Sequence, residues 1–278
     1  MQSTNEGQAN AAGTASRRRL SKRAVRVANN ANVAGERSDF KPSFKARFSE
    51  MVLINFEADQ RLLKQITPKG LEPDLFQGSA QISLVAKTIR NLKCCGFPLS
   101  RNFASVGLQL YVKEPLGDGN YRYGTFFLKH YVQRSVAAWM MSRLTQSDVS
   151  QMPMKCKTSK LPNNRPPDIE YQWMVRERWN DIRIRGRSRV KDIRPDSKAG
   201  YVFRHADRYV VNEKGVWRSE LSTPGWVIWD VAQARFECDV ENLFGAQFSK
   251  AMSRRPSSVF LSRGNEVSVS KPMLVGSV

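Results

Sequence analysis

The run SVGLQLYVKEPLGDGNYRYGTFFLKHYVQRSVAAWMMSRLT, residues 105–145, carries the pattern that decides the fold. Two runs rich in β-branched and aromatic residues, 105–114 and 121–132, flank the turn formers LGDGN and predict two strands. A helical pattern follows over 132–145, and it is the one convincing longer helix of the chain. The apolar residues expected on its common face are Val136, Trp139, Met140 and Leu144.

Further short strands are predicted on both sides of this run. SAQISLVAKTIRNL (79–92) and EVSVSK (266–271) are two of several β-rich runs separated by turn formers, whereas a short helix near Leu62 and Leu63 ends before Pro68. Many strands with few helices favour a barrel or a sandwich. We therefore predict a mainly β protein with minor α content, folded as a single domain over residues 48–275.

Residues 1–47 differ from the rest of the chain. Up to Phe48 there are ten Lys and Arg against three acidic residues, without an apolar stripe or alternation. A segment of this composition cannot bury enough apolar surface to fold, so we predict a disordered basic arm. Its polar residues also interrupt the place where the apolar part of an export signal would lie.

Composition excludes several classes of protein. The chain has 278 residues, a formal net charge of +20 and a pI near 10.2, which makes an anionic partner plausible. Two histidines and four cysteines without CxxC spacing predict neither a metal site nor a disulfide framework, and no motif predicts a cofactor. No apolar run is long enough for a membrane span, and we expect a cytoplasmic protein. The oligomeric state is not predicted.

Lys155 and Lys157, in MPMKCKTS, are candidate catalytic residues. On a strand both would point to one face, where two close cations lower each other's pKa and leave one amine neutral and nucleophilic. The alternative is a pair of solvated lysines. His130 follows an apolar strand, and we interpret it as a partly buried, hydrogen-bonded histidine in preference to a general base.

The run YQWMVRERWNDIRIRGRSRV, residues 171–190, predicts an arginine-rich hairpin with Asn180 and Asp181 in its turn. Its apolar face, which includes Tyr171 and Trp173, should point at the core. The opposite face would pair Arg178 with Arg183 and Arg176 with Arg185. Such a face is either solvated charge or an anion-binding surface, whose candidates are Arg176, Arg178, Arg183, Arg185, Arg187 and Arg189.

Six of these runs, taken in order from NFEADQRLLKQ at residue 55 to VFLSRGNEVSVSKP at residue 259, resemble the YqjF-like uncharacterised family. The resemblance covers roughly residues 49–272. That family belongs to the acetoacetate decarboxylase-like superfamily, so the resemblance implies a closed, cone-shaped β-barrel with an internal cavity and one or two packed helices.

The chain also departs from the family pattern. Ser105, Gly107 and Gln109 stand where relatives usually carry Glu, Asn and Arg, whereas Tyr111 is kept. Lys155 is the nearest analogue of the lysine that forms a Schiff base in the decarboxylases, at a longer spacing. The residues that the resemblance places around the cavity are Gln109, Tyr111, Phe127, Lys129 and Arg143.

Three functions follow from these observations. The leading one is binding of a small apolar or mixed-polarity ligand in the cavity, without decarboxylase activity. An alternative is an enzyme that acts on a small keto acid through a lysine imine. The other alternative is a polyanion-binding protein that uses the basic arm and the arginine-rich hairpin. A fold alone does not decide between them.

Overall fold

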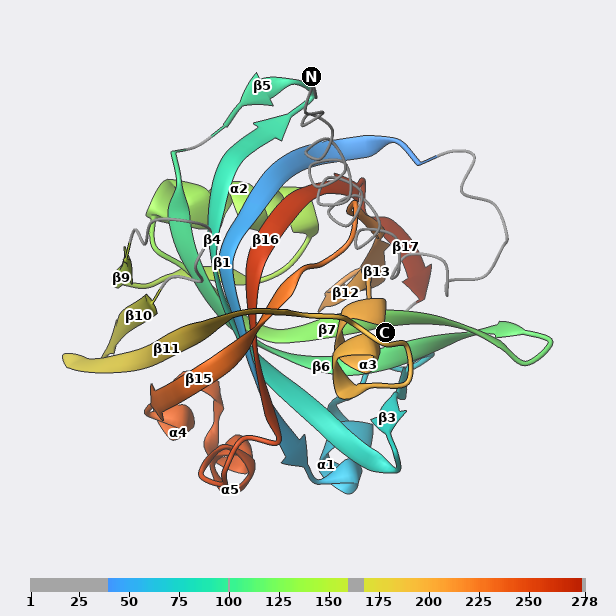
Figure 1. Cartoon of the computed structure of the whole chain (residues 1–278). Helices are drawn as coiled ribbons and strands as arrows, with labels where there is room; N and C mark the ends of the chain where they lie inside the picture. Colours follow the sequence, from blue (N-terminus) through green and yellow to red (C-terminus); the bar gives the residue numbers. More distant parts are fainter. Residues whose placement is uncertain (1–39, 100, 160–167, 277–278) are drawn as a thin grey trace, which may run out of the picture.

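The computed structural model describes residues 40–99, 101–159 and 168–276. The arm before residue 40, with its predicted disorder and its charge, lies outside the described residues. Figure 1 shows a β structure in which long curved strands run through the middle of the molecule and short helices lie at its ends. The mainly β fold predicted from the sequence is confirmed.

The elements in chain order are β1 (Pro42–Ala58), α1 (Gln60–Ile66), β2 (Glu72–Pro73), β3 (Leu75–Phe76), β4 (Ser79–Cys94), β5 (Phe97–Pro98), β6 (Phe103–Gly117), β7 (Asn120–Val132), α2 (Ser135–Thr145), β8 (Val149–Gln151), β9 (Met154–Thr158), β10 (Asp168–Val175), β11 (Arg178–Lys191), α3 (Lys198–Arg204), β12 (Asp207–Asn212), β13 (Gly215–Ser219), β14 (Leu221–Ser222), β15 (Ile228–Glu237), α4 (Val240–Phe244), α5 (Ser249–Met252), β16 (Ser258–Ser270) and β17 (Met273–Gly276).

Five long strands form a wall that the whole molecule shares. β16, β1, β4, β6 and β7 pair in this order, each antiparallel to the next. Both outer edges of the wall then divide. Along β7, β12 pairs with residues 124–126 and β8 with residues 130–132. Along β16, β15 pairs with residues 261–262 and β14 with residues 268–269.

The divided edges complete two rings on the same wall. One ring leads from β7 through β8, along the chain into β9, and then through β10, β11 and β15 back to β16. The other leads through β12 and β13 and along the chain into β14. The wall is therefore covered on both faces, and its strands are buried on both sides.

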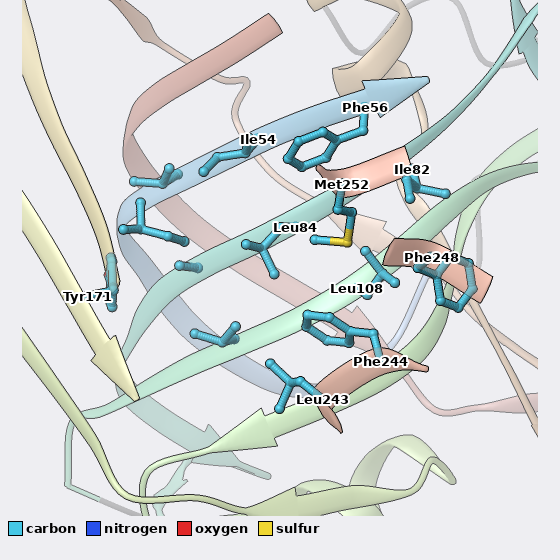
Figure 2. Close-up of a cluster of buried hydrophobic side chains, with 14 of the residues drawn as sticks. Ile54, Phe56, Ile82, Leu84, Leu108, Tyr171, Leu243, Phe244, Phe248 and Met252 are labelled. Carbon is cyan, nitrogen blue, oxygen red and sulfur yellow. The ribbon is translucent and has the colours of Figure 1, made fainter. Parts of the chain in front are cut away.

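Each face of the wall carries its own set of side chains, because successive residues of a strand point to opposite faces. On β4, Leu84 and Ala86 belong to the larger core, whereas Val85 and Lys87 point the other way. Figure 2 shows the larger core, where side chains of α4, α5 and the turn between them close the end of the first ring: Leu243, Phe244, Phe248 and Met252.

β1 begins at Pro42, six residues before the predicted domain boundary. Phe44 and Ala46 are buried and pair with β4 and β16, so residues 42–47 belong to the barrel and the assignment of this part to the arm was wrong. The reason is a bulge at Glu50, whose φ is 49°, which interrupts the alternation of apolar residues in the sequence.

The helix α2 packs with only part of the face that the sequence pattern predicted, because Met140 is buried and Leu144 lies against the core whereas Val136 and Trp139 do not. Val136 and Trp139 are 63% and 64% exposed, and Trp139 lies against the Arg143 guanidinium, with 5.8 Å between the ring centroid and Cζ. The buried residues are Ala137, Ala138, Met140 and Met141. Small side chains let the helix approach its neighbours closely, and this contact decides the orientation.

The arginine-rich hairpin is present, but the predicted turn was wrong. Arg176 and Glu177 form the turn, with φ of 44° and 63°, and Val175 pairs with Arg178. This register places Tyr171 opposite Ile182. The tight turn needs positive φ at both central residues, and the gain from apolar pairing on the core side outweighs the poor turn chemistry of Arg and Glu.

We expect Gly264→Ala to lower the free energy of unfolding by about 2 kcal/mol more than Gly70→Ala does. Both glycines have φ near +85°, at +81° and +87°, so an added methyl strains both backbones. Only at Gly264 would the Cβ also collide with the Phe48 carbonyl, whereas the space around Gly70 is open. Urea unfolding of both variants measures the difference, and equal losses would contradict the close approach of β16 to β1.

Candidate functional site

A cavity of about 100 Å³ lies on the face of the wall opposite to the larger core. Strands β1, β4, β6 and β7 form its floor, and α3, β12 and the segment around β14 cover it. Its walls are mostly apolar. The lining residues that carry polar groups are Lys87, Gln109, Thr125, His130, His205 and Arg208.

Lys87 comes from the middle of β4 and is 6% exposed. Its ammonium lies over two aromatic rings, 4.2 Å from the centroid of Phe48 and 5.6 Å from that of Phe127. Burial, and secondly the charge of Arg208, lower the pKa of Lys87 from 10.5 to about 7. Near neutral pH a large part of the protein therefore holds this amine uncharged.

Arg208 enters the cavity from β12. Its guanidinium stacks on Phe127, with Cζ 4.4 Å from the ring centroid, and one Nη donates a hydrogen bond of 3.2 Å to His130 Nδ1. Its buried Nε has no hydrogen-bond partner among the described residues. Burial lowers the pKa of Arg208 to about 10, so the group keeps its positive charge at neutral pH.

His130 connects Arg208 to the floor of the cavity. Arginine only donates, so His130 Nδ1 accepts, and Nε2 carries the proton that is donated to Ser105 Oγ at 2.7 Å. Burial, together with the charges of Arg208 and Lys87, lowers the pKa of His130 well below 6.5. A neutral imidazole thus orients the guanidinium, as the sequence interpretation of a hydrogen-bonded His130 predicted.

A bulge in β7 brings Phe127 and His130 to the same side. Gln109 pairs with Phe127 and the preceding Leu108 pairs with Lys129, which leaves Leu128 without an opposite residue. Gly107 lies beneath: a Cβ there would come within 3.3 Å of the Phe127 ring and 2.8 Å of the Lys129 carbonyl oxygen. The absence of a side chain at Gly107 therefore makes room for the ring against which both cations lie.

No aspartate or glutamate lines the cavity among the described residues. The nearest acidic cluster lies behind His205, where Asp74 binds Arg204 and the His205 ring at 2.6 and 3.0 Å. Burial acts to raise the pKa of Asp74, but His205 and Arg204 lower it overall. The charges of this cluster pair with one another. Lys87 and Arg208 therefore face the cavity without a compensating carboxylate.

The structure brings together only part of the predicted cavity residues. Gln109 and Phe127 line the cavity. Tyr111 is fully buried beside it, where its hydroxyl meets Asn55 and Ser83 and its ring packs on Tyr201 and His205. The placement of Lys129 and Arg143 in the cavity was wrong: both are exposed, because the β7 bulge turns Lys129 outward and Arg143 lies on the outer face of α2.

Lys155 and Lys157 do point to one face of β9, as predicted, but that face is the outer surface. Lys155 lies 4.4 Å from the centroid of the Trp179 ring, and Lys157 faces Glu170 at 3.9 Å. They do not reach the cavity, so nothing in the cavity supports them as candidate catalytic lysines, and that assignment stays a prediction. Lys87 takes that place; the signal for it was a single charge inside the apolar run SLVAKTI.

The arginines of the hairpin meet carboxylates. Arg183 binds Glu170 and Asp181, both at 3.1 Å, Arg185 binds Asp168 at 3.6 Å, and Arg178 binds Glu237 at 3.5 Å. The predicted pairs of like charge, Arg178 with Arg183 and Arg176 with Arg185, were wrong because the register differs. Arg176 and Arg187 are exposed, and the side chain of Arg189 lies outside the described residues.

The fold, a double ring of strands on a shared wall with a small cavity, is similar to that of acetoacetate decarboxylase-like proteins of known structure. An acetoacetate decarboxylase-like enzyme from Sphingomonas wittichii RW1 matches with a TM-score of 0.58 and 11% identity, over 90% of this chain and 99% of that one. Acetoacetate decarboxylase from Legionella pneumophila matches with a TM-score of 0.56 and 10% identity, over 88% and 93%.

The enduracididine biosynthesis enzyme MppR, in complex with pyruvate, matches with a TM-score of 0.58 and 15% identity, over 87% of this chain and 94% of that one. At these identities the likeness shows the fold alone. The chain belongs to the DUF2071 family, described as an uncharacterized conserved protein, whose model matches residues 45–266. The resemblance found in the sequence is thereby confirmed. No curated protein sequence gives a significant match.

In the part of the chain that the structure describes, no group of three or more His, Cys, Asp or Glu is placed to hold a metal ion. No helix there is long and apolar enough to cross a membrane.

We expect Lys87→Met to remove a rise of stability with pH. The unfolded lysine binds its proton up to about pH 10.5, whereas the folded one loses it near pH 7, so the wild-type free energy of unfolding should rise between these values. The difference from the variant should change by at most about 1.4 kcal/mol per pH unit. Urea unfolding at pH 7, 8 and 9 measures it; parallel curves would show that Lys87 is not a depressed lysine.

Proposed function

We propose that this protein binds one small organic acid in its cavity, with the carboxylate of the ligand on Arg208. The observation that carries the proposal is a partly buried guanidinium whose buried Nε has no partner, in a cavity without an acidic side chain among the described residues. A buried charge is costly unless it is paired. A ligand carboxylate would accept two parallel hydrogen bonds from Nε and Nη and supply the missing charge.

The volume limits the size of the ligand. An engineered apolar cavity of about 150 Å³ holds one benzene molecule. A cavity of about 100 Å³ therefore suits an acid no larger than benzene, such as propionate with about five or pyruvate with about six non-hydrogen atoms. That the structurally similar MppR binds pyruvate supports an acid of this size.

The apolar walls determine the rest of the ligand. Leu53, Val85, Val202 and Phe203 surround the polar groups, and they offer no hydrogen bonds to a second charge or a sugar. The proposed ligand is thus a short acid with a single carboxylate and a compact apolar or carbonyl-bearing body. This proposal is narrower than the prediction from the sequence, which was a small apolar or mixed-polarity ligand.

We expect Arg208→Gln to raise the Kd for propionate at least tenfold, because charge-assisted hydrogen bonds contribute about 1.5–3 kcal/mol each. Isothermal titration of the wild type with propionate and with its neutral amide, propionamide, measures the role of the charge. Arg185→Gln is the matched control, since Arg185 lies on the surface beside Asp168. Equal binding by the Arg208 variant, or equal affinity for amide and acid, would refute the proposal.

A second candidate function is reaction of Lys87 with a keto acid. The neutral amine would attack the ketone carbon, and loss of one water molecule would leave an imine between Lys87 Nζ and that carbon. The carboxylate on Arg208 would hold the ketone near the amine. The specific observation that favours it is a buried lysine with a lowered pKa beside a second cation, the arrangement that keeps an amine nucleophilic.

We expect pyruvate followed by borohydride to leave a reduced adduct on Lys87, located by peptide mass spectrometry. Lys87→Met should lose the adduct, whereas Lys155→Met and Lys157→Met should keep it, because both of these lysines lie on the outer surface. An adduct that persists in the Lys87 variant would show that the chemistry does not belong to this cavity.

The absence of decarboxylase activity on acetoacetate stays a prediction. The sequence argument for it was that only a displaced pair of lysines is present, and that argument no longer applies, since Lys87 and Arg208 supply a buried amine with an adjacent cation. Imine formation and loss of carbon dioxide are separate steps, and a protonated imine would itself accept the electron pair released in the second one. Polyanion binding by the hairpin is less favoured, because its arginines meet carboxylates.

A further inference from the structure

The Lys87 amine, a nucleophile, and the Arg208 guanidinium, an anion receptor, line the same cavity. Lys87 Nζ and the Arg208 guanidinium both lie against the Phe127 ring, 5.6 Å and 4.4 Å from its centroid. On the wall, Lys87 pairs directly with Ser105, whose hydroxyl binds the His130 that orients Arg208. The two cations are therefore held in fixed positions by one aromatic ring and one hydrogen-bonded chain.

We propose that Lys87 is a carbamylation site, at which the amine captures carbon dioxide and the resulting carbamate binds Arg208. This modification uses the same cavity as the proposed function but needs no organic acid. It would replace a neutral amine beside a lone cation by an ion pair, which the described lining residues do not otherwise provide.

The reaction balances with carbon dioxide as the only co-reactant. The lone pair of the neutral Nζ forms a bond to the carbon of carbon dioxide, and one C=O π pair moves onto oxygen. The nitrogen then loses one proton to solvent, which leaves a carbamate with a single negative charge. No oxidant, reductant or metal takes part.

Three features of the cavity favour this reaction. Carbon dioxide is small and uncharged, so it can enter an apolar cavity of about 100 Å³ without the desolvation cost of bicarbonate. Burial and Arg208 keep the amine largely uncharged near neutral pH. The product's oxygens can accept hydrogen bonds from Arg208, including the Nε that lacks a partner.

The carbamate would also act on the proposed function. It occupies Arg208 and consumes the amine, so carbon dioxide should compete with organic acids and block imine formation. The fraction of Lys87 that carries a carbamate would then depend on the concentration of carbon dioxide.

The test equilibrates the full chain with ¹³C-labelled bicarbonate and carbon dioxide at pH 7.5 and traps carbamates as stable esters with a trialkyloxonium salt. Peptide mass spectrometry then locates the label. We expect at least about tenfold more label on Lys87 than on Lys155 or Lys157, because an exposed carbamate gains no buried guanidinium. Arg208→Gln should lower the label on Lys87 several-fold, and Arg185→Gln should not change it.

The outcome separates this inference from the proposed function. Equal label on Lys87 and the exposed lysines, or an unchanged level in Arg208→Gln, would overturn carbamylation, even if propionate still binds to Arg208. Label confined to Lys87 in a protein that does not bind propionate would support carbamylation and refute the organic acid. Urea unfolding of Arg208→Gln shows whether that variant is folded, so that a loss of label there is not mistaken for a loss of folding.

Discussion

The wall of β16, β1, β4, β6 and β7 is buried on both faces, and the rest of the structure depends on this constraint. Neither face may be left to water, so each needs its own ring of strands and its own core. One ring is filled by apolar side chains and closed by α4 and α5. The other encloses the cavity. The polar residues in the middle of the wall, such as Lys87 and Gln109, therefore point into the protein.

This constraint explains what the sequence could predict. Strand texture and the family resemblance are properties of many residues at once; the first predicted the mainly β fold and the second the acetoacetate decarboxylase-like fold. The resemblance also placed Gln109 and Phe127 at the cavity, where they pair across the neighbouring strands β6 and β7. Lys129 was misplaced because one bulged residue, Leu128, reverses the alternation, and a bulge has no reliable sequence signal.

The central pair of the site could not be predicted in the same way. Lys87 and Arg208 are 121 residues apart, and they meet only because β12 joins the edge of β7. Arg208 sits in a run, ADRYVVN, that looks like any half-exposed strand. Lys87 is a single charge in an apolar run. The family resemblance, however, made Lys155 the nearest analogue of the lysine that forms a Schiff base in the decarboxylases. The prediction of the hairpin register failed for a related reason: apolar cross-strand pairing on the core side, such as Tyr171 with Ile182, outweighs the turn preferences of local sequence.

The charge of the cavity is what gives these residues a function. Two buried cations cost free energy, and a glutamate between them would remove that cost. Such a glutamate would also keep Lys87 protonated and pair with Arg208. Lys87 could then not react with a carbonyl compound, and Arg208 could not bind an anion. The structure holds the cations by other means: the Phe127 and Phe48 rings face them, and neutral His130 accepts from Arg208 without neutralising it. Such contacts orient a charge but leave it uncompensated. The fold loses stability by leaving this charge uncompensated, and an anion that pairs with the charge gains the same free energy as binding affinity.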